Sequence, residues 1–270
     1  MDRVQRDVLS LIKSAPVERR WLVPGILPTH SIIVLAGDAG VGKSSLCYRL
    51  GMSMATGTHF LNRAVQPTRV IYFDEENNEP DCQAYMSKLW KGEPGNEELL
   101  RINFRFEHFS LIDPKNDCYH VMARMVSDFK PMLIVIDTYV SALEIEDPNS
   151  NGEANVALHK LRLIKSLTDE ACTMVLLHHI TEHPKTHEKD IAGAKGLKRW
   201  TDGTILHKLA PGRPRTDGLH RSVLEFAKLR GFGSHRSITI TPVPNSHGGV
   251  RLVGSDPDGS IYEFNSTNNI

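Results

Sequence analysis

The chain has 270 residues, of which 40% are apolar, so it is long enough to bury a substantial core. Lys plus Arg and Asp plus Glu each total 32, so net charge gives no support for a nucleic-acid partner, and any such contact must come from a local patch. No apolar run approaches the about 18 residues of a membrane span, no signal-peptide pattern is present, and the four cysteines are scattered, so we expect a cytoplasmic protein with reduced thiols and no membrane contact.

The first informative segment is glycine-rich and follows an apolar, β-branched run at residues 32–36. It fits the phosphate-binding pattern G-x-x-x-x-G-K-[ST], and helical composition follows it, as that pattern requires. We expect backbone N–H groups to bind phosphate oxygens, Lys43 to reach the β- and γ-phosphates, and the Ser44 hydroxyl to ligate Mg²⁺. The residues expected to hold the nucleotide are Gly37, Asp38, Ala39, Gly40, Val41, Gly42, Lys43, Ser44 and Ser45.

Apolar runs then alternate with helical segments along the chain. This alternation predicts an α/β fold with a mainly parallel central sheet flanked by helices. In the last of these helices we expect Val156, Leu158, Leu161, Leu163 and Ile164 to cover the sheet. The expected strands are 70–73, 102–106, 132–136 and 173–177, and the expected helices are 80–90, 117–129 and 153–168.

The pattern changes at both ends of the chain. After residue 204, short alternating segments are separated by Gly and Pro turns, which predicts antiparallel strands that extend one edge of the sheet. At the other end, residues 2–14 place Val4, Val8, Leu11 and Ile12 on one helical face, which could pack on its own core or on a neighbouring subunit. The expected late strands are 204–209, 222–229, 237–241, 250–253 and 261–264.

Carboxylates stand at the ends of two expected strands. Asp137 follows the run 132–136, and because ligands bind at the carboxyl ends of parallel strands, we expect it to hold Mg²⁺ together with Ser44. Asp74, Glu75 and Glu76 follow the run 70–73. Hydrolysis of a nucleoside triphosphate needs a group that orients or deprotonates water, and we assign Glu76 this role, with Glu75 as its rival. Asp74 and Glu75 could equally be solvated loop charges.

A histidine pair, His178 and His179, ends the run 173–177 and therefore lies at the same sheet edge as the nucleotide. A polar side chain at that position could contact the γ-phosphate and report its loss. We expect His179 to have this sensing role.

These motifs together resemble those of the RecA-like ATPases, and within them the DnaB-type and plasmid RepA-type hexameric helicases. The resemblance extends from residue 21, where the segment Trp-Leu-Val-Pro-Gly-Ile-Leu begins, to residue 232. It implies a RecA-like P-loop NTPase core at residues 21–270, preceded by an N-terminal helical arm at 1–20. It also implies ATP and Mg²⁺ as cofactors and a homo-oligomer, with a hexameric ring expected.

The resemblance adds two late cations to the expected catalytic set. Lys228 and Arg230 match the strand whose Lys and Arg reach the nucleotide of the neighbouring subunit in that family. Such a cation stabilises the charge that develops on transferring phosphoryl oxygens, and it can contribute about 10³–10⁵ in rate. The expected catalytic residues are Lys43, Glu76, Asp137, His179, Lys228 and Arg230.

A modest excess of positive charge follows His179, in the region that faces the central channel in the family. In a ring, six copies of such a segment would add up their contacts to the backbone phosphates of single-stranded DNA. The candidate DNA-binding residues are Lys185, Lys189, Lys195, Lys198 and Arg199.

The resemblance therefore implies an ATP-dependent helicase or translocase on single-stranded DNA, in the replication of a plasmid, phage or other mobile element. Two alternatives stay open. One is a RecA-like accessory ATPase in recombination or strand annealing. The other is a KaiC-type, nucleotide-gated regulatory ATPase that does not act on DNA.

Overall fold

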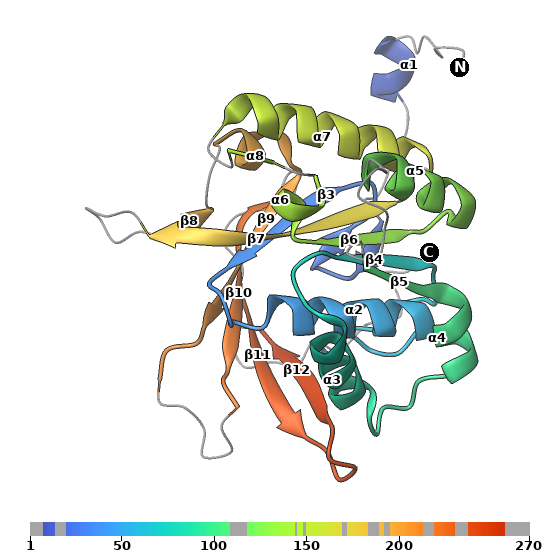
Figure 1. The fold of residues 1–270 in the computed structure, drawn as a ribbon, viewed down its shortest axis with the longest axis vertical. Coiled ribbons are helices and arrows are strands. Elements are labelled where there is room, and N and C mark those ends of the chain that lie inside the picture. The colour runs from blue at the N-terminus through green and yellow to red at the C-terminus, as the bar shows by residue number, and fades with distance from the viewer. Residues whose placement is uncertain are drawn as a thin grey trace.

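The computed structural model describes residues 8–13, 20–108, 118–143, 145–147, 150–168, 172–182, 189–191, 195–212, 219–229 and 237–256. They form an α/β fold around one large twisted sheet (Figure 1). Its strand order is β12-β11-β10-β9-β3-β7-β6-β4-β5, and β8 pairs with the end of β7. The strands are β3 (Ile32–Gly37), β4 (Val70–Asp74), β5 (Phe104–His108), β6 (Leu133–Asp137), β7 (Thr173–Glu182), β8 (Lys189–Ile191), β9 (Gly203–Leu209), β10 (Ser222–Leu229), β11 (Ser237–Pro244) and β12 (Val250–Ser255).

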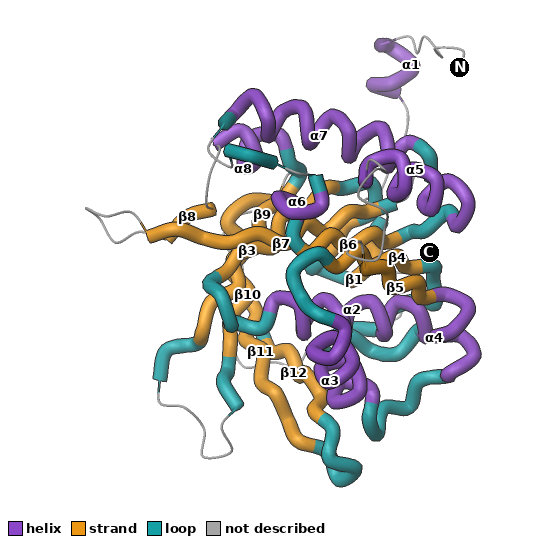
Figure 2. Tube along the Cα trace, viewed as in Figure 1, coloured by secondary structure: helices purple, strands orange, loops and turns teal. Residues whose placement is uncertain are grey.

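Helices cover both faces of the sheet (Figure 2). One face carries α2 (Lys43–Thr56), α3 (Glu79–Trp90) and α4 (Glu97–Asn103), and the other carries α5 (Cys118–Phe129), α6 (Tyr139–Ala142), α7 (Asn151–Ser166) and α8 (Lys195–Trp200). Successive residues of a strand point to opposite faces, so β3 contributes Ile33 and Leu35 to one core cluster and Val34 and Ala36 to the other. This burial on both faces explains why the central strands are continuously apolar in sequence.

The predicted antiparallel extension is correct for β10, β11 and β12, and for residues 204–209 it is correct on one side only. β9 pairs antiparallel with β10, yet on its other side it lies parallel to β3, with Gly37 opposite His207. The first five residues of β9 are all buried, so this strand belongs to the parallel core. The predicted strand 261–264 lies outside the described residues.

Two further predictions need correction. The strand predicted at 102–106 begins only at Phe104, because Asn96 caps α4 by accepting hydrogen bonds from the backbone of Glu98 and Leu99, and that helix runs to Asn103. On α7, Val156 and Leu163 are 59% and 45% exposed. The side of α7 that covers the sheet consists of Ala154, Ala157, Leu158, Leu161 and Ile164.

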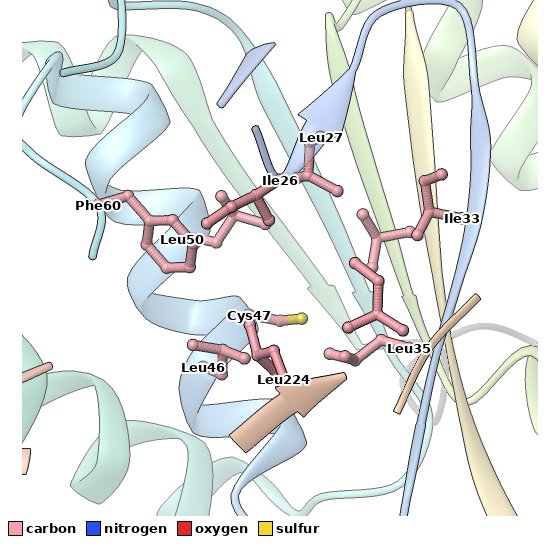
Figure 3. Close-up of a pocket in the computed structure, with 11 residues that line it drawn as sticks. Ile26, Leu27, Ile33, Leu35, Leu46, Cys47, Leu50, Phe60 and Leu224 are labelled. Atoms are coloured by element: carbon pink, nitrogen blue, oxygen red, sulfur yellow. The ribbon is translucent and has the colours of Figure 1, made fainter. Parts of the chain in front are cut away.

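Before β3 the chain forms a short hairpin of β1 (Trp21–Val23) and β2 (Leu27–Pro28). Between this hairpin, α2 and the sheet lies a small apolar cavity of about 20 Å³, lined by residues that include Ile26, Leu50 and Phe60 (Figure 3). It is too small and too apolar to hold a nucleotide, so it belongs to the core.

The N-terminal helix α1 (Val8–Lys13) stands away from the body of the molecule in Figure 1. Val8, Leu9 and Ile12 are 66%, 61% and 72% exposed, so these side chains do not pack on the core of their own chain. The division into an arm at 1–20 and a domain at 21–270 stays a prediction. Among the described residues, no helix combines the length and apolar character needed to cross a membrane.

Candidate active site

The glycine-rich segment at residues 37–45, called the phosphate loop below, connects the end of β3 to the start of α2. Gly40 and Gly42 have φ angles of 74° and 95°, a region that residues with side chains rarely adopt. At Gly37 the constraint is space, since a Cβ atom there would lie 2.4 Å from the carbonyl oxygen of His207. The curled loop therefore needs glycine at these positions for two different reasons.

The side chain of Lys43 turns back into the phosphate loop. Its Nζ atom donates hydrogen bonds to the carbonyl oxygens of Gly37 and Asp38, each at 3.0 Å. Burial lowers the pKa of Lys43, while the charges of Glu76, Asp137 and Asp38 oppose that shift. The ammonium group thus lies inside the curl of the loop, where phosphate oxygens would enter.

Asp137 ends β6 and is fully buried. Its Oδ2 atom accepts a hydrogen bond of 2.8 Å from the Tyr72 hydroxyl. Burial, the largest cause, raises the pKa of Asp137 to about 7, whereas hydrogen bonds from Ser44 and Tyr72 favour the ionised carboxylate. Ser44 and Asp137 are thus neighbours that offer two oxygen ligands, and a divalent cation between them would remove the cost of ionising Asp137.

Asp74 lies beside Asp137, because β4 and β6 are paired in register. It is fully buried, so of the two alternatives left open for Asp74, a solvated loop charge is excluded. Its carboxylate accepts hydrogen bonds from the Tyr48 hydroxyl and from the backbone N–H groups of Glu76 and Asn77, the latter two at 3.1 and 2.9 Å. Asp74 therefore shapes the turn that presents Glu76.

Glu76 and His179 meet across the open edge of the sheet. The Glu76 Oε1 and His179 Nε2 atoms are 3.6 Å apart, and the two side chains are 40% and 42% exposed. Of the acidic groups that raise the pKa of Lys43, Glu76 acts most strongly. The structure thus gathers Glu76, His179 and Lys43 at the mouth of the phosphate loop.

The neighbours of these two residues point elsewhere. Glu75 is half-buried, and its backbone N–H donates to the carbonyl oxygen of Asp137. His178 is buried, and its ring packs edge-on against Tyr139 with 5.0 Å between the ring centroids. Alternation along a strand explains the second difference, since only one residue of a consecutive pair can face the site. The geometry favours Glu76 over Glu75 and His179 over His178.

The sequence analysis missed His207 on β9, which lies beneath the phosphate loop and is only 2% exposed. Its Nε2 atom is 2.8 Å from the Ser222 hydroxyl oxygen. A single histidine within an apolar strand is usually an ordinary core residue, so no motif drew attention to it. Only the parallel pairing of β9 with β3 would have indicated its position, and the sequence alone does not predict that pairing.

Lys228 lies at the opposite edge of the sheet from the phosphate loop, because it pairs with Thr204 near the start of β9. Its Nζ atom donates hydrogen bonds to the carbonyl oxygens of Lys198, Arg199 and Thr201, at 2.6, 3.2 and 2.7 Å. Within one chain, Lys228 therefore caps the C-terminal end of α8. Arg230 lies outside the described residues, and its role in a neighbouring site stays a prediction.

The basic candidates for DNA binding fall around β8 and α8. Lys198 is half-buried and Arg199 is exposed on α8. The structure describes only the backbone of Lys189 on β8 and of Lys195 on α8, and Lys185 lies outside the described residues. The carbonyl oxygen of Trp200 accepts a hydrogen bond of 2.7 Å from Arg162 of α7. Arg162 of α7 and Lys228 of β10 thus both donate hydrogen bonds to carbonyl oxygens at the C-terminal end of α8.

Comparison with known proteins places this architecture in a family. Residues 2–183 match the model of a family described as an AAA domain, and the chain belongs to that family. A solved structure of a KaiC-like protein from the hyperthermophilic archaeon Pyrococcus horikoshii has a similar fold, with a TM-score of 0.56 and 17% identity. The match covers 88% of this chain and 99% of that one. No curated protein is significantly similar in sequence.

Fold, phosphate loop and family together define a P-loop ATPase with a RecA-like core. The mainly parallel sheet with antiparallel strands at its C-terminal side agrees with the fold class that the sequence predicts. The resemblance to DnaB-type and RepA-type helicases stays a proposal.

Proposed function

We propose that this protein is an ATP-dependent DNA helicase or translocase that acts as a ring on single-stranded DNA, in the replication of a plasmid, phage or other mobile element. The observation that carries the proposal is the pairing of Glu76 with His179 at 3.6 Å. His179 belongs to β7, and the end of β7 pairs antiparallel with β8, which precedes the basic helix α8 in the chain. One strand therefore connects the place where ATP would be hydrolysed with the candidate DNA-binding segment.

Each residue of the site has a defined part in ATP hydrolysis. The amide groups of the phosphate loop and the Lys43 ammonium bind the β- and γ-phosphates and hold them in line for attack. Ser44 and Asp137 would hold Mg²⁺, which would supply positive charge to neutralise the phosphate oxygens. Glu76 orients the attacking water and accepts its proton. His179 contacts the γ-phosphate or Glu76, so its position depends on whether that phosphate is present.

Oligomerisation completes the site in this proposal. Arg230 and Lys228 act on the nucleotide of the adjacent subunit, which explains why Lys228 need not lie near the phosphate loop of its own chain. For Lys228 this requires release from the three carbonyl oxygens at the end of α8. The exposed apolar side chains of α1 supply a surface for contact with a neighbour.

A KaiC-type regulatory ATPase is the second candidate, and the likeness to a KaiC-like fold and the balanced net charge favour it. A RecA-like accessory ATPase in recombination or strand annealing is a third. All three share the nucleotide site and differ in the macromolecule on which they act.

One set of measurements separates the candidates. ATP turnover is measured with and without single-stranded DNA, unwinding is measured on a tailed duplex, and the mass of the assembly is measured with a non-hydrolysable ATP analogue. A helicase shows DNA-stimulated turnover, unwinding and a closed ring. Stimulation without unwinding, in filaments, supports the recombination role. Turnover that DNA does not change contradicts both DNA-dependent functions and leaves the regulatory one.

A further inference from the structure

His207 is a buried, titratable side chain packed directly against the phosphate loop. Its backbone pairs with Gly37 at the start of the loop, and its carbonyl oxygen fills the space where a Gly37 Cβ would be. Its Cε1 atom lies 4.0 Å from the position of a Cβ on Gly42, at the other end of the loop. The residue thus pairs with the start of the loop and its ring faces the Gly42 position, while only 2% of its surface is exposed.

The two ring nitrogens of His207 differ in their surroundings. Nε2 is hydrogen-bonded to the Ser222 hydroxyl, whereas Nδ1 is buried and has no hydrogen-bond partner among the residues that the structure describes. Burial, the larger cause, and the Lys43 charge together lower the pKa of His207 to about 4, so the ring is neutral at pH 7. A buried polar atom without a partner costs about 1–3 kcal/mol, so its retention needs a reason.

The phosphate loop supplies that reason. When phosphates fill such a loop, its N–H groups turn inward toward them, and carbonyl oxygens turn outward toward the surrounding protein. Lys43 now occupies two of the carbonyl oxygens, those of Gly37 and Asp38, with an ammonium group that the phosphates would attract. Binding of a nucleotide would therefore leave loop carbonyl oxygens in need of a donor, in the loop against which His207 packs.

We propose that His207 is a positioning residue for the nucleotide, whose Nδ1–H group donates a hydrogen bond to a backbone carbonyl of the phosphate loop in the nucleotide-bound state. The Ser222 hydroxyl is compatible with this tautomer, because it can donate to Nε2 when Nδ1 carries the proton. The inference rests on ATP binding by the phosphate loop and is independent of whether the protein acts on DNA.

Two substitutions separate the ring nitrogens. In His207→Asn the side-chain amide occupies the position of Nδ1, and in His207→Gln it occupies the position of Nε2. We expect His207→Asn to bind Mg²⁺-bound ATP analogue within about threefold of wild type, and His207→Gln to bind at least about tenfold more weakly at a similar melting temperature. Ser222→Ala is the matched control, because it removes only the hydrogen-bond partner of Nε2. We expect this variant to bind the ATP analogue about as well as His207→Asn does.

The proposal would be overturned if His207→Gln bound the ATP analogue nearly as well as wild type and His207→Asn bound it weakly. It would also be overturned if both variants lost binding equally and in proportion to their loss of melting temperature, because a histidine with a purely structural role predicts that result. Should the variants not fold, ¹⁵N-histidine spectra of wild type give the test. The imidazole that stays neutral at pH 5 must shift its Nδ1 resonance when nucleotide binds, and an unchanged resonance contradicts the proposal. Wild-type protein that binds no nucleotide would contradict the ATPase assignment itself, whereas missing DNA stimulation would not.

Discussion

The carboxylate of Glu76 lies 3.6 Å from the imidazole of His179, although the two residues belong to strand ends more than a hundred positions apart in the chain. β6 lies between their strands, β4 and β7, so the side chains approach each other over the end of β6, where Asp137 lies. The residues proposed to activate water, to sense phosphate and to hold Mg²⁺ thus meet at one sheet edge.

Glu76→Gln keeps the size of the side chain but removes the group that accepts a proton. We expect nucleotide binding to persist and ATP turnover to fall at least about a hundredfold. The matched control is Glu75→Gln, because Glu75 is half-buried and directed by its backbone contact with Asp137. Turnover and binding of a fluorescent ATP analogue are measured in parallel. Should Glu75→Gln be the inactive variant, the assignment of Glu76 is wrong.

His179→Ala removes the side chain that joins Glu76 to β7. We expect ATP binding to change little, while the stimulation of turnover by single-stranded DNA falls several-fold, because the candidate DNA-binding segment would no longer respond to the phosphate. The measurement is the ratio of turnover with DNA to turnover without it. His179→Gln, which keeps a polar group at that point, should retain part of the stimulation. Equal ratios in the Ala variant and wild type would exclude a sensing role.

Asp137 makes the stability of the nucleotide-free protein depend on pH. Its pKa is raised from 3.8 to about 7, so in this range the folded state holds a proton that the unfolded state has released. The stabilisation is complete below about pH 4 and is lost as the pH rises toward 7, and by linkage it amounts to at most about 4 kcal/mol. We expect Asp137→Asn to flatten the dependence of stability on pH between 4 and 7 and to remove stabilisation by Mg²⁺ above pH 7. Urea unfolding across that range measures both effects, and an unchanged slope in the variant contradicts the assignment.

The residues of this site differ in how well the sequence alone predicts their positions. The positions of the phosphate loop, Asp137 and His179 were predictable, because a buried parallel strand is a continuous apolar run and the residues that follow such strands share one edge of the sheet. Burial of Asp74 was not predictable, because it depends on Tyr48 from α2 and on a turn that closes only in three dimensions. The sequence shows three consecutive carboxylates without revealing which of them are shielded from water.

Longer-range pairings were harder still. The position of His207 requires β9 to lie parallel to β3, and the helical crossover that permits this is only the six-residue α8. Lys228 contacts the end of α8 across a separation of about thirty residues, and no local pattern encodes that contact. Both cases depend on which strands are neighbours, and alternation of apolar residues does not determine that order.

The contacts of Lys228 lead to a prediction within a single chain. Lys228→Met keeps the length of the side chain but leaves the carbonyl oxygens of Lys198, Arg199 and Thr201 without their donor. We expect a loss of about 1–3 kcal/mol in stability and faster amide exchange in α8, with nucleotide binding to the phosphate loop retained. Arg162→Met, which frees only the Trp200 carbonyl oxygen, should have a smaller effect of the same kind. Unaltered exchange in α8 would show that Lys228 does not fasten it in solution.

Arg230 provides the test on which the ring model depends. Because we propose that it serves the nucleotide of a neighbour, Arg230→Ala protein should be almost inactive alone, yet it should still bind ATP and assemble. Lys43→Ala protein should also be inactive, since it lacks the charge that meets the β- and γ-phosphates. When the two variants are mixed, some interfaces combine an intact phosphate loop with an intact Arg230. Those interfaces should regain measurable ATP turnover.

The mixing experiment needs proof that subunits exchange, which fluorescence transfer between labelled variants supplies. A matched control mixes Lys43→Ala with Glu76→Gln. Both changes affect the same face of a subunit, so no mixed interface has a complete loop side, and activity should stay absent. Full activity of an Arg230→Ala monomer would exclude action on a neighbour. Exchange without any recovery of turnover would mean that Arg230 and Lys43 act in the same subunit or that Arg230 is needed for assembly, and in either case the proposed shared site would be wrong.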